Sequence, residues 1–155
     1  MLQVSTSKLR GPTLVGRARG HVVVSDRSPA DGGGDLGFTS GELMLLAVGS
    51  CVVGNLNHFA EGQGTELRDL SAAVRVEETS DGGYGAITVD VQIGDDVSEE
   101  MLAALGGAAS SGRVTGRMRQ NSEVHISINR STGPATAGFS GARDGRDANT
   151  EGPVT

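Results

Sequence analysis

The chain has 155 residues, 36% of them hydrophobic, with 25 glycines, one cysteine and a formal net charge of -6. This length suits one domain with a single core, and the acidic balance argues against a nucleic-acid surface. The single cysteine, Cys51, excludes an intramolecular disulfide and any multi-cysteine metal site. The three histidines show no metal-ligand spacing, so we expect neither a metal nor a cofactor.

Both ends of the chain bear on its location and extent. The first 16 residues lack the apolar region of a signal peptide, and no run approaches 18 apolar residues. We therefore expect a cytoplasmic protein with no membrane partner. Residues 131–155 contain one large apolar side chain, Phe139, which is too little to offset the entropy of ordering. The sequence predicts one folded domain over residues 1–130 and a disordered tail over 131–155.

Three strands are predicted first, over residues 3–9, 13–19 and 21–26, the last of them rich in β-branched residues. Residues 27–38, RSPADGGGDLGF, contain too much glycine for regular structure and predict a flexible loop. The three consecutive glycines lack the lysine and Ser/Thr of a phosphate-binding loop.

A long helix is predicted next. It begins at a T-x-x-E capping box formed by Thr39 and Glu42, and it ends near Gly62 and Gly64. Residues 43–53 are apolar on every face of this helix, and such a helix must be covered on every face. We expect it at the centre of the fold, with a sheet on one side and a second subunit on the other.

Further elements complete the domain. Two alternating strands are predicted over residues 70–77 and 87–93, with a hairpin turn at Asp81-Gly82 between them. A second helix follows Ser98 as cap and breaks near residues 106–112, and a final strand covers 124–128. The predicted order is β-β-β-α-β-β-α-β, which indicates an α+β fold with a largely antiparallel sheet.

Residues 37–77, GFTSGELMLLAVGSCVVGNLNHFAEGQGTELRDLSAAVRVE, resemble the OsmC/Ohr family, the osmotically inducible and organic-hydroperoxide-resistance proteins. The family helix reads Gly-x-x-P-x-Glu-Leu-Leu-Leu-Ala-Ala-Leu-x-x-Cys, and Ser40 stands here in place of its proline. Residues 97–118 are similar to the family's second-cysteine helix, and residues 16–28 to its early paired strands. The resemblance covers about residues 8–130. It implies an OsmC-like fold and an intertwined homodimer with an active site at each subunit interface.

The resemblance also implies a chemistry. In peroxidase members the first cysteine is oxidised to a sulfenic acid, a second cysteine closes a disulfide, and a dithiol regenerates the enzyme. Cys51 corresponds to the first cysteine, whereas Gly112 occupies the second-cysteine position, so a two-cysteine cycle within this chain is impossible. The position of the assisting glutamate is Gly41, and Glu42 is better interpreted as the cap residue.

An assisting arginine is also implied, and it falls at Arg17 or Arg19. We favour Arg19 because it abuts Gly20 at a turn. Cys51 lies about three turns into its helix, too far for the helix dipole to activate it. Only an arginine from another element could do so.

The sequence leaves three functions open. The first is an OsmC-like thiol-dependent peroxidase of the oxidative stress response, which reduces small organic hydroperoxides. Cys51 is its catalytic nucleophile, Arg19 its activating cation, and an external thiol its resolver and reductant. The second is a catalytically degenerate homodimer that binds an apolar small molecule at the subunit interface. The third is a purely structural dimer in which Cys51 only packs, as free cysteines often do.

Overall fold

The computed structural model describes residues 3–94, 97–119 and 124–130, so the tail predicted over 131–155 lies outside the described residues. The strands are β1 (Ser5–Arg10), β2 (Thr13–Ala18), β3 (His21–Ser25), β4 (Ser71–Glu78), β5 (Tyr84–Ile93) and β6 (Val124–Arg130). The helices are α1 (Ser40–Gly62), α2 (Glu99–Ala109) and α3 (Arg113–Arg119), with a short 3-10 turn, η1 (Pro29–Asp31), before α1.

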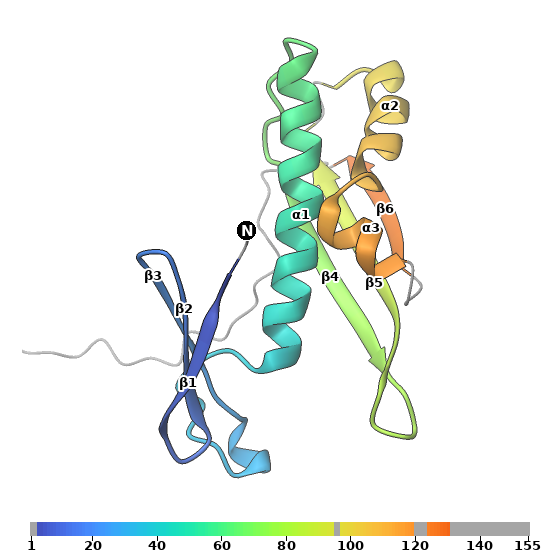
Figure 1. Ribbon diagram of the computed structural model, residues 1–155. Helices are drawn as coiled ribbons and strands as arrows, with labels where there is room; N and C mark the ends of the chain where they lie inside the picture. Colours follow the sequence, from blue (N-terminus) through green and yellow to red (C-terminus); the bar gives the residue numbers. More distant parts are fainter. Residues whose placement is uncertain (1–2, 95–96, 120–123, 131–155) are drawn as a thin grey trace, which may run out of the picture.

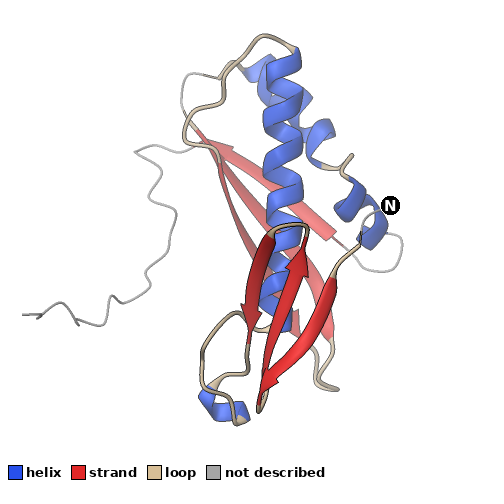
Figure 2. Ribbon diagram, turned by 60° about the vertical axis from the view of Figure 1, so that its left-hand side comes forward, coloured by secondary structure: helices blue, strands red, loops and turns tan. Residues whose placement is uncertain are grey.

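The described strands form two sheets of three. In the first sheet β2 pairs antiparallel with both β1 and β3. In the second, β5 lies between β4 and β6. The second sheet packs with α2 and α3 against α1, whereas the first sheet lies on the other side of the N-terminal half of α1 (Figures 1 and 2). The α+β prediction is confirmed.

The core lies between α1, the second sheet and α2. One stripe of α1 is fully buried, with a residue every fourth position: Val48, Val52, Leu56 and Ala60. This spacing keeps the four side chains on one helical face. They form one cluster with apolar residues from β5 and α2, namely Ile87, Val89, Val91, Ile93, Leu105 and Ala109. The opposite face of α1 remains open, and Leu46 on it is 50% exposed.

Local signals in the sequence predicted the element boundaries well. The Thr39 hydroxyl accepts from the Glu42 amide at 3.3 Å, and the Glu42 carboxylate accepts from the Thr39 amide at 2.6 Å, which completes the capping box. Ser98 caps α2 by accepting from the Met101 amide. The hairpin between β4 and β5 turns at Gly82, whose φ is +79°, a backbone angle that suits glycine.

The expected largely antiparallel pairing is found in three of the four strand pairs that the structure describes. The pairing of β6 with β5 is parallel, because the chain crosses back over the sheet through α2 and α3 before entering β6. The break expected near residues 106–112 is also found: α2 ends at Ala109, and a separate short helix, α3, begins at Arg113.

By length and composition alone, α1 would suffice to cross a membrane, although only 28% of its most apolar window is buried within the chain. Core helices of soluble proteins can be equally long and apolar. The buried stripe packs on β5 and α2, as in a core helix, and the low buried share reflects the open opposite face.

Candidate functional site

Cys51 lies in the middle of α1 and is partly accessible to solvent. The Asn55 amide, one turn further along the helix, donates to the Cys51 Sγ at 3.8 Å. This is a weak interaction, since thiol sulfur is a poor acceptor. The sulfur is therefore held between its own helix and the segment that packs over it, which begins at Gly112.

Gly112 is buried directly against the thiol. A Cβ at this position would lie 2.4 Å from the Cys51 Sγ and 2.2 Å from the Asn55 Nδ2. Only glycine fits here without movement of these side chains, because atoms in contact stay beyond about 3.5 Å. The structure thus brings position 112, the expected second-cysteine position, next to Cys51, and it leaves no room there for a second side chain.

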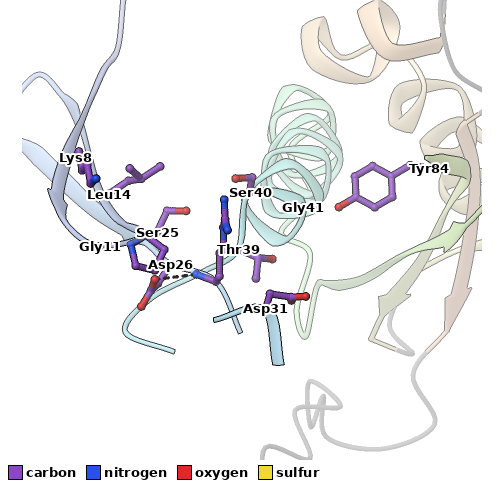
Figure 3. Close-up of a pocket in the computed structure, with 12 residues that line it drawn as sticks. Lys8, Gly11, Leu14, Ser25, Asp26, Asp31, Thr39, Ser40, Gly41 and Tyr84 are labelled. Carbon is purple, nitrogen blue, oxygen red and sulfur yellow. Dashed lines mark hydrogen bonds between the residues drawn. The ribbon is translucent and has the colours of Figure 1, made fainter. Parts of the chain in front are cut away.

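Gly41 lies in the first turn of α1, and a Cβ built on it would lie 2.3 Å from the Tyr84 hydroxyl. Figure 3 shows the Tyr84 side chain directed toward this turn from β5. Tyr84 was not predicted as a site residue from the sequence, although it is the chain's only tyrosine and stands at a predicted hairpin. Gly41 and Cys51 are separated by about 15 Å along the axis of α1, at 1.5 Å per residue.

The two candidate arginines lie on the first sheet. Arg19 forms the turn between β2 and β3 with Gly20, since Ala18 pairs with His21, and its φ is +56°. This left-handed region is uncommon for a residue other than glycine. Both Arg17 and Arg19 are exposed, and the turn lies away from the middle of α1 (Figure 1). Within one protomer, neither arginine meets Cys51.

The glycine-rich loop over residues 27–38, which the sequence predicts to be flexible, is hydrogen-bonded to the side chain of Asp26. Asp26, only 4% exposed, accepts hydrogen bonds from the amides of Arg27 at 2.9 Å, Gly34 at 3.0 Å and Leu36 at 3.2 Å. Burial alone would raise the pKa of Asp26, but these three amides and the Thr13 hydroxyl outweigh it and hold the pKa below its ordinary value of 3.8.

Glycine is required in this loop for close approach of the backbone. The Arg27 carbonyl oxygen would lie 1.9 Å from a Cβ at position 33. The sequence alone did not show that Asp26 accepts hydrogen bonds from the amides of this loop. The signal that was available is Asp26 itself, an acidic residue at the end of a β-branched strand.

An open cleft of about 750 Å³ lies between this loop, the first sheet and the start of α1 (Figure 3). Its lining combines polar, charged and apolar side chains: Lys8, Gly11, Pro12, Leu14, Ser25, Asp26, Arg27, Asp31, Thr39, Ser40, Gly41 and Tyr84. Among the residues that the structure describes, no three His, Cys, Asp or Glu side chains gather to hold a metal ion.

The comparisons with known proteins agree with this architecture. A family model, described as OsmC-like protein, matches residues 32–132, well over half of the chain. The chain belongs to the OsmC-like family. This confirms the OsmC/Ohr resemblance. No curated protein matches this OsmC-like sequence.

Solved structures show the same fold at low sequence identity. An OsmC-like protein from Mycoplasma pneumoniae has a TM-score of 0.72 at 14% identity, covering 84% of this chain and 96% of its own. The organic hydroperoxide resistance protein OhrB of Bacillus subtilis has a TM-score of 0.61 at 20% identity, covering 83% and 98%. An organic hydroperoxide resistance protein OsmC from Legionella pneumophila has a TM-score of 0.63 at 16% identity, covering 83% and 96%. The predicted OsmC-like fold is thereby confirmed.

Proposed function

We propose that this OsmC-like protein is a cytoplasmic, thiol-dependent reductase of small organic hydroperoxides that takes part in oxidative stress defence. The observation that carries the proposal is the placement of Cys51, the chain's one thiol, which is partly accessible in the middle of α1. Two proteins of the same fold, from Bacillus subtilis and Legionella pneumophila, are organic hydroperoxide resistance proteins.

The reaction balances with Cys51 as the only protein thiol. The Cys51 thiolate attacks the terminal peroxide oxygen of ROOH and the O–O bond breaks, which gives a cysteine sulfenic acid and the alkoxide RO⁻. The alkoxide takes a proton from solvent and leaves as the alcohol ROH. The sulfur is oxidised by two electrons and the peroxide is reduced by two. An external thiol then condenses with the sulfenic acid and releases water, and a second external thiol reduces the mixed disulfide back to Cys51.

Activation of Cys51 requires a nearby cation, and in one protomer the turn that carries Arg19 lies to the side of α1 (Figure 1). A positive charge favours the thiolate, and Arg19 is the arginine that we assign to this role. Because the β2–β3 turn lies away from Cys51 in one chain, the arginine must come from a second copy. The homodimer is therefore part of the proposal. The open face of α1, which includes Leu46, supplies apolar surface for it.

The resolving thiol must come from outside the chain. Gly112 occupies the expected position of a second cysteine and closes over the sulfur, so a reductant cannot approach through α3. It has to arrive from the accessible side of Cys51.

The test uses the full chain with one equivalent of cumene hydroperoxide and a sulfenic-acid trap, read by intact mass. We expect one adduct per chain in the wild type and none in Cys51→Ser. Arg19→Gln should slow adduct formation by at least about tenfold, while the matched variant Arg17→Gln should react at the wild-type rate. A thiol that ignores peroxide and alkylates slowly, only in alkaline solution, would exclude a peroxidase.

The second candidate function is the binding of an apolar small molecule at the interface of a catalytically inactive dimer. One observation favours it: Gly41 and Gly112 both lack functional side chains, and the Tyr84 hydroxyl and the Asn55 amide fill the adjoining space. An unreactive Cys51 in a stable dimer that binds apolar probes would support this function over the reductase.

A further inference from the structure

The side chain of Asn55 is a polar group in the apolar middle of α1. Between Glu42 and His58 this helix carries no charged side chain, and most of its residues are apolar. Asparagine is a poorer helix former than alanine, so an interaction of its side chain is the expected reason for its presence here. Its amide nitrogen, Nδ2, donates a hydrogen bond to the Cys51 Sγ at 3.8 Å.

The amide and the sulfur are packed together under the start of α3. Asn55 lies four residues after Cys51, so the two side chains are neighbours on one face of α1. The backbone of Gly112 covers both of them, since a Cβ there would lie 2.2 Å from Nδ2 and 2.4 Å from Sγ. Thr115, which is fully buried, closes the same space, with its hydroxyl 2.8 Å from that Cβ position. The contact between Asn55 and Cys51 is therefore built into the packing of α3 on α1.

The strength of this hydrogen bond depends on the charge of the sulfur. A neutral thiol is a poor acceptor, which agrees with the long distance of 3.8 Å. A thiolate is an anion, and hydrogen bonds to charged groups are shorter and roughly twice as strong as those between neutral groups. The N–H group of Asn55 therefore stabilises the thiolate more than the thiol, although it carries no charge of its own.

The charged groups around this contact are distant along the helix or exposed. On α1 the nearest are His58 and Glu42, about 10 Å and 13 Å from Cys51 along the axis at 1.5 Å per residue. Charged side chains that the structure shows as exposed also lie on the elements packed against α1: Glu99 and Glu100 on α2, Arg113 and Arg117 on α3, and Arg75, Glu77 and Glu78 on β4. Among the described residues, Asn55 is thus the side chain that donates to the sulfur.

We propose that Asn55 stabilises the thiolate of Cys51 by donating from Nδ2 to Sγ, and that it thereby assists the reaction with peroxide. Its part in that reaction rests on the proposed reductase function. Asn55 and Cys51 belong to the same protomer, so this contribution does not need the dimer, and it adds to that of Arg19. The hydrogen bond is strongest while the sulfur is charged, and it weakens when the sulfur gives its electron pair to the peroxide oxygen.

A donor of this kind has two opposite effects on the reaction rate. It increases the fraction of thiolate at low pH, but it makes each thiolate less nucleophilic, with a Brønsted coefficient of about 0.4–0.5. Loss of the donor therefore slows the reaction at low pH and speeds it at high pH, where every thiol is ionised. A sulfur that is merely displaced would react more slowly at every pH.

The test is the rate of Cys51 alkylation by iodoacetamide between pH 5 and pH 10, measured by intact mass on the full chain. In Asn55→Ala the midpoint of the pH–rate profile should rise by about one pH unit, a tenfold change in thiolate fraction at low pH. The rate should fall about threefold below both midpoints and rise about threefold above them. Asn57→Ala is the matched control with the wild-type profile, because its amide donates to Glu61 at 2.7 Å.

A second variant preserves the size of the side chain. Asn55→Asp places a carboxylate beside the sulfur, and its midpoint should rise further than that of Asn55→Ala, because a negative charge disfavours the thiolate. The proposal is overturned if the midpoint of Asn55→Ala equals that of the wild type or of Asn57→Ala. A midpoint in Asn55→Asp that lies below that of Asn55→Ala overturns it as well.

The same variants with one equivalent of cumene hydroperoxide and a sulfenic-acid trap separate this proposal from the reductase function. If no variant reacts with peroxide but the alkylation midpoint rises in Asn55→Ala, the stabilisation by Asn55 is supported and the reductase is excluded. If the wild type forms the sulfenic acid and Asn55→Ala keeps the wild-type alkylation profile, the reductase stands and the role of Asn55 is overturned.

Discussion

The backbone of Gly112 lies against the thiol of Cys51, so the side chain at this position decides how much room the sulfur has. A Cβ there would meet the Sγ at 2.4 Å and the Asn55 Nδ2 at 2.2 Å, and both atoms belong to a helix packed in the core. The absence of a second cysteine is therefore more than the loss of one functional group. The backbone at Gly112 and the side chains of Cys51 and Asn55 pack together in the space that a second cysteine side chain would need.

We predict that Gly112→Ala lowers the free energy of unfolding by about 1–3 kcal/mol, the range for inserting a methyl group into a packed site. The matched control is Gly116→Ala in α3, where a Cβ would meet nothing within 4 Å. That variant should raise stability by about 0.5–1 kcal/mol, because alanine favours a helix over glycine. Urea unfolding measures both.

A double-mutant comparison with Asn55→Ala tests whether contact with the Asn55 side chain causes the loss of stability in Gly112→Ala. In an Asn55→Ala background the Nδ2 is absent, so Gly112→Ala should cost less than it does in the wild type. Equal stability changes in the two glycine variants would contradict the close packing at position 112. An unchanged stability loss from Gly112→Ala in the Asn55→Ala background would contradict it as well.

At the scale of elements, the loop between β3 and α1 depends on one carboxylate. Asp26 accepts from amides at both ends of the glycine-rich segment and so fixes the path from the end of β3 to the capping box of α1. The folded-state pKa of Asp26 lies below 3.8. The folded protein therefore binds fewer protons at this site than the unfolded chain does near pH 4.

We predict that Asp26→Asn destabilises the protein above pH 4, since an amide group cannot accept from three donors as a carboxylate does. The stabilisation by the wild-type carboxylate is fully present above the unfolded-state value and is lost as the pH falls through the lower folded-state pKa. The difference in urea midpoint between wild type and Asp26→Asn should therefore shrink from pH 5 to pH 2.5. A difference that is constant or that grows on acidification would contradict the role of Asp26. Asp35→Asn, in the same loop but exposed, is the control.

Features that depend on residues close together in the sequence could be predicted, whereas features that depend on distant residues could not. The capping box at Thr39, the cap at Ser98 and the turn at Gly82 each involve residues within a few positions of one another, and all three are found. The strand over 87–93 could also be predicted from the sequence, because every second residue in it is apolar and buried.

The remaining features depend on contacts between distant segments. The parallel pairing of β6 follows from the path of α2 and α3, which no local pattern encodes. Likewise, Tyr84 meets Gly41 and Ser25 faces α1 only after the chain has folded. The candidate site was found at Cys51 through the family resemblance, whereas the cleft at the start of α1 was missed.

At the scale of the whole molecule, the single chain leaves apolar surface uncovered. Every residue of β1 is exposed, and large apolar side chains are open to solvent on β3, in the loop before α1 and on α1 itself, including Val22, Leu36, Phe38 and Leu46. Soluble monomers rarely expose a contiguous apolar patch of more than a few hundred Å². In the proposed dimer, a second copy of the chain would cover the open face of α1 and bring its Arg19 to Cys51.

We predict that the wild type is a dimer in light-scattering measurements, with twice the 15.8 kDa mass of one chain. Leu46→Glu should yield a monomer, because an unpaired carboxylate at the centre of an apolar interface costs several kcal/mol. Ala103→Glu, on the exposed surface of α2, is the matched control and should remain dimeric.

If Arg19 acts across the interface, the Leu46→Glu monomer will also lose sulfenic-acid formation at Cys51 while its helical circular dichroism is retained. A monomeric wild type would contradict the proposed dimer. A Leu46→Glu monomer that reacts with peroxide at the wild-type rate would show that Cys51 needs no partner subunit.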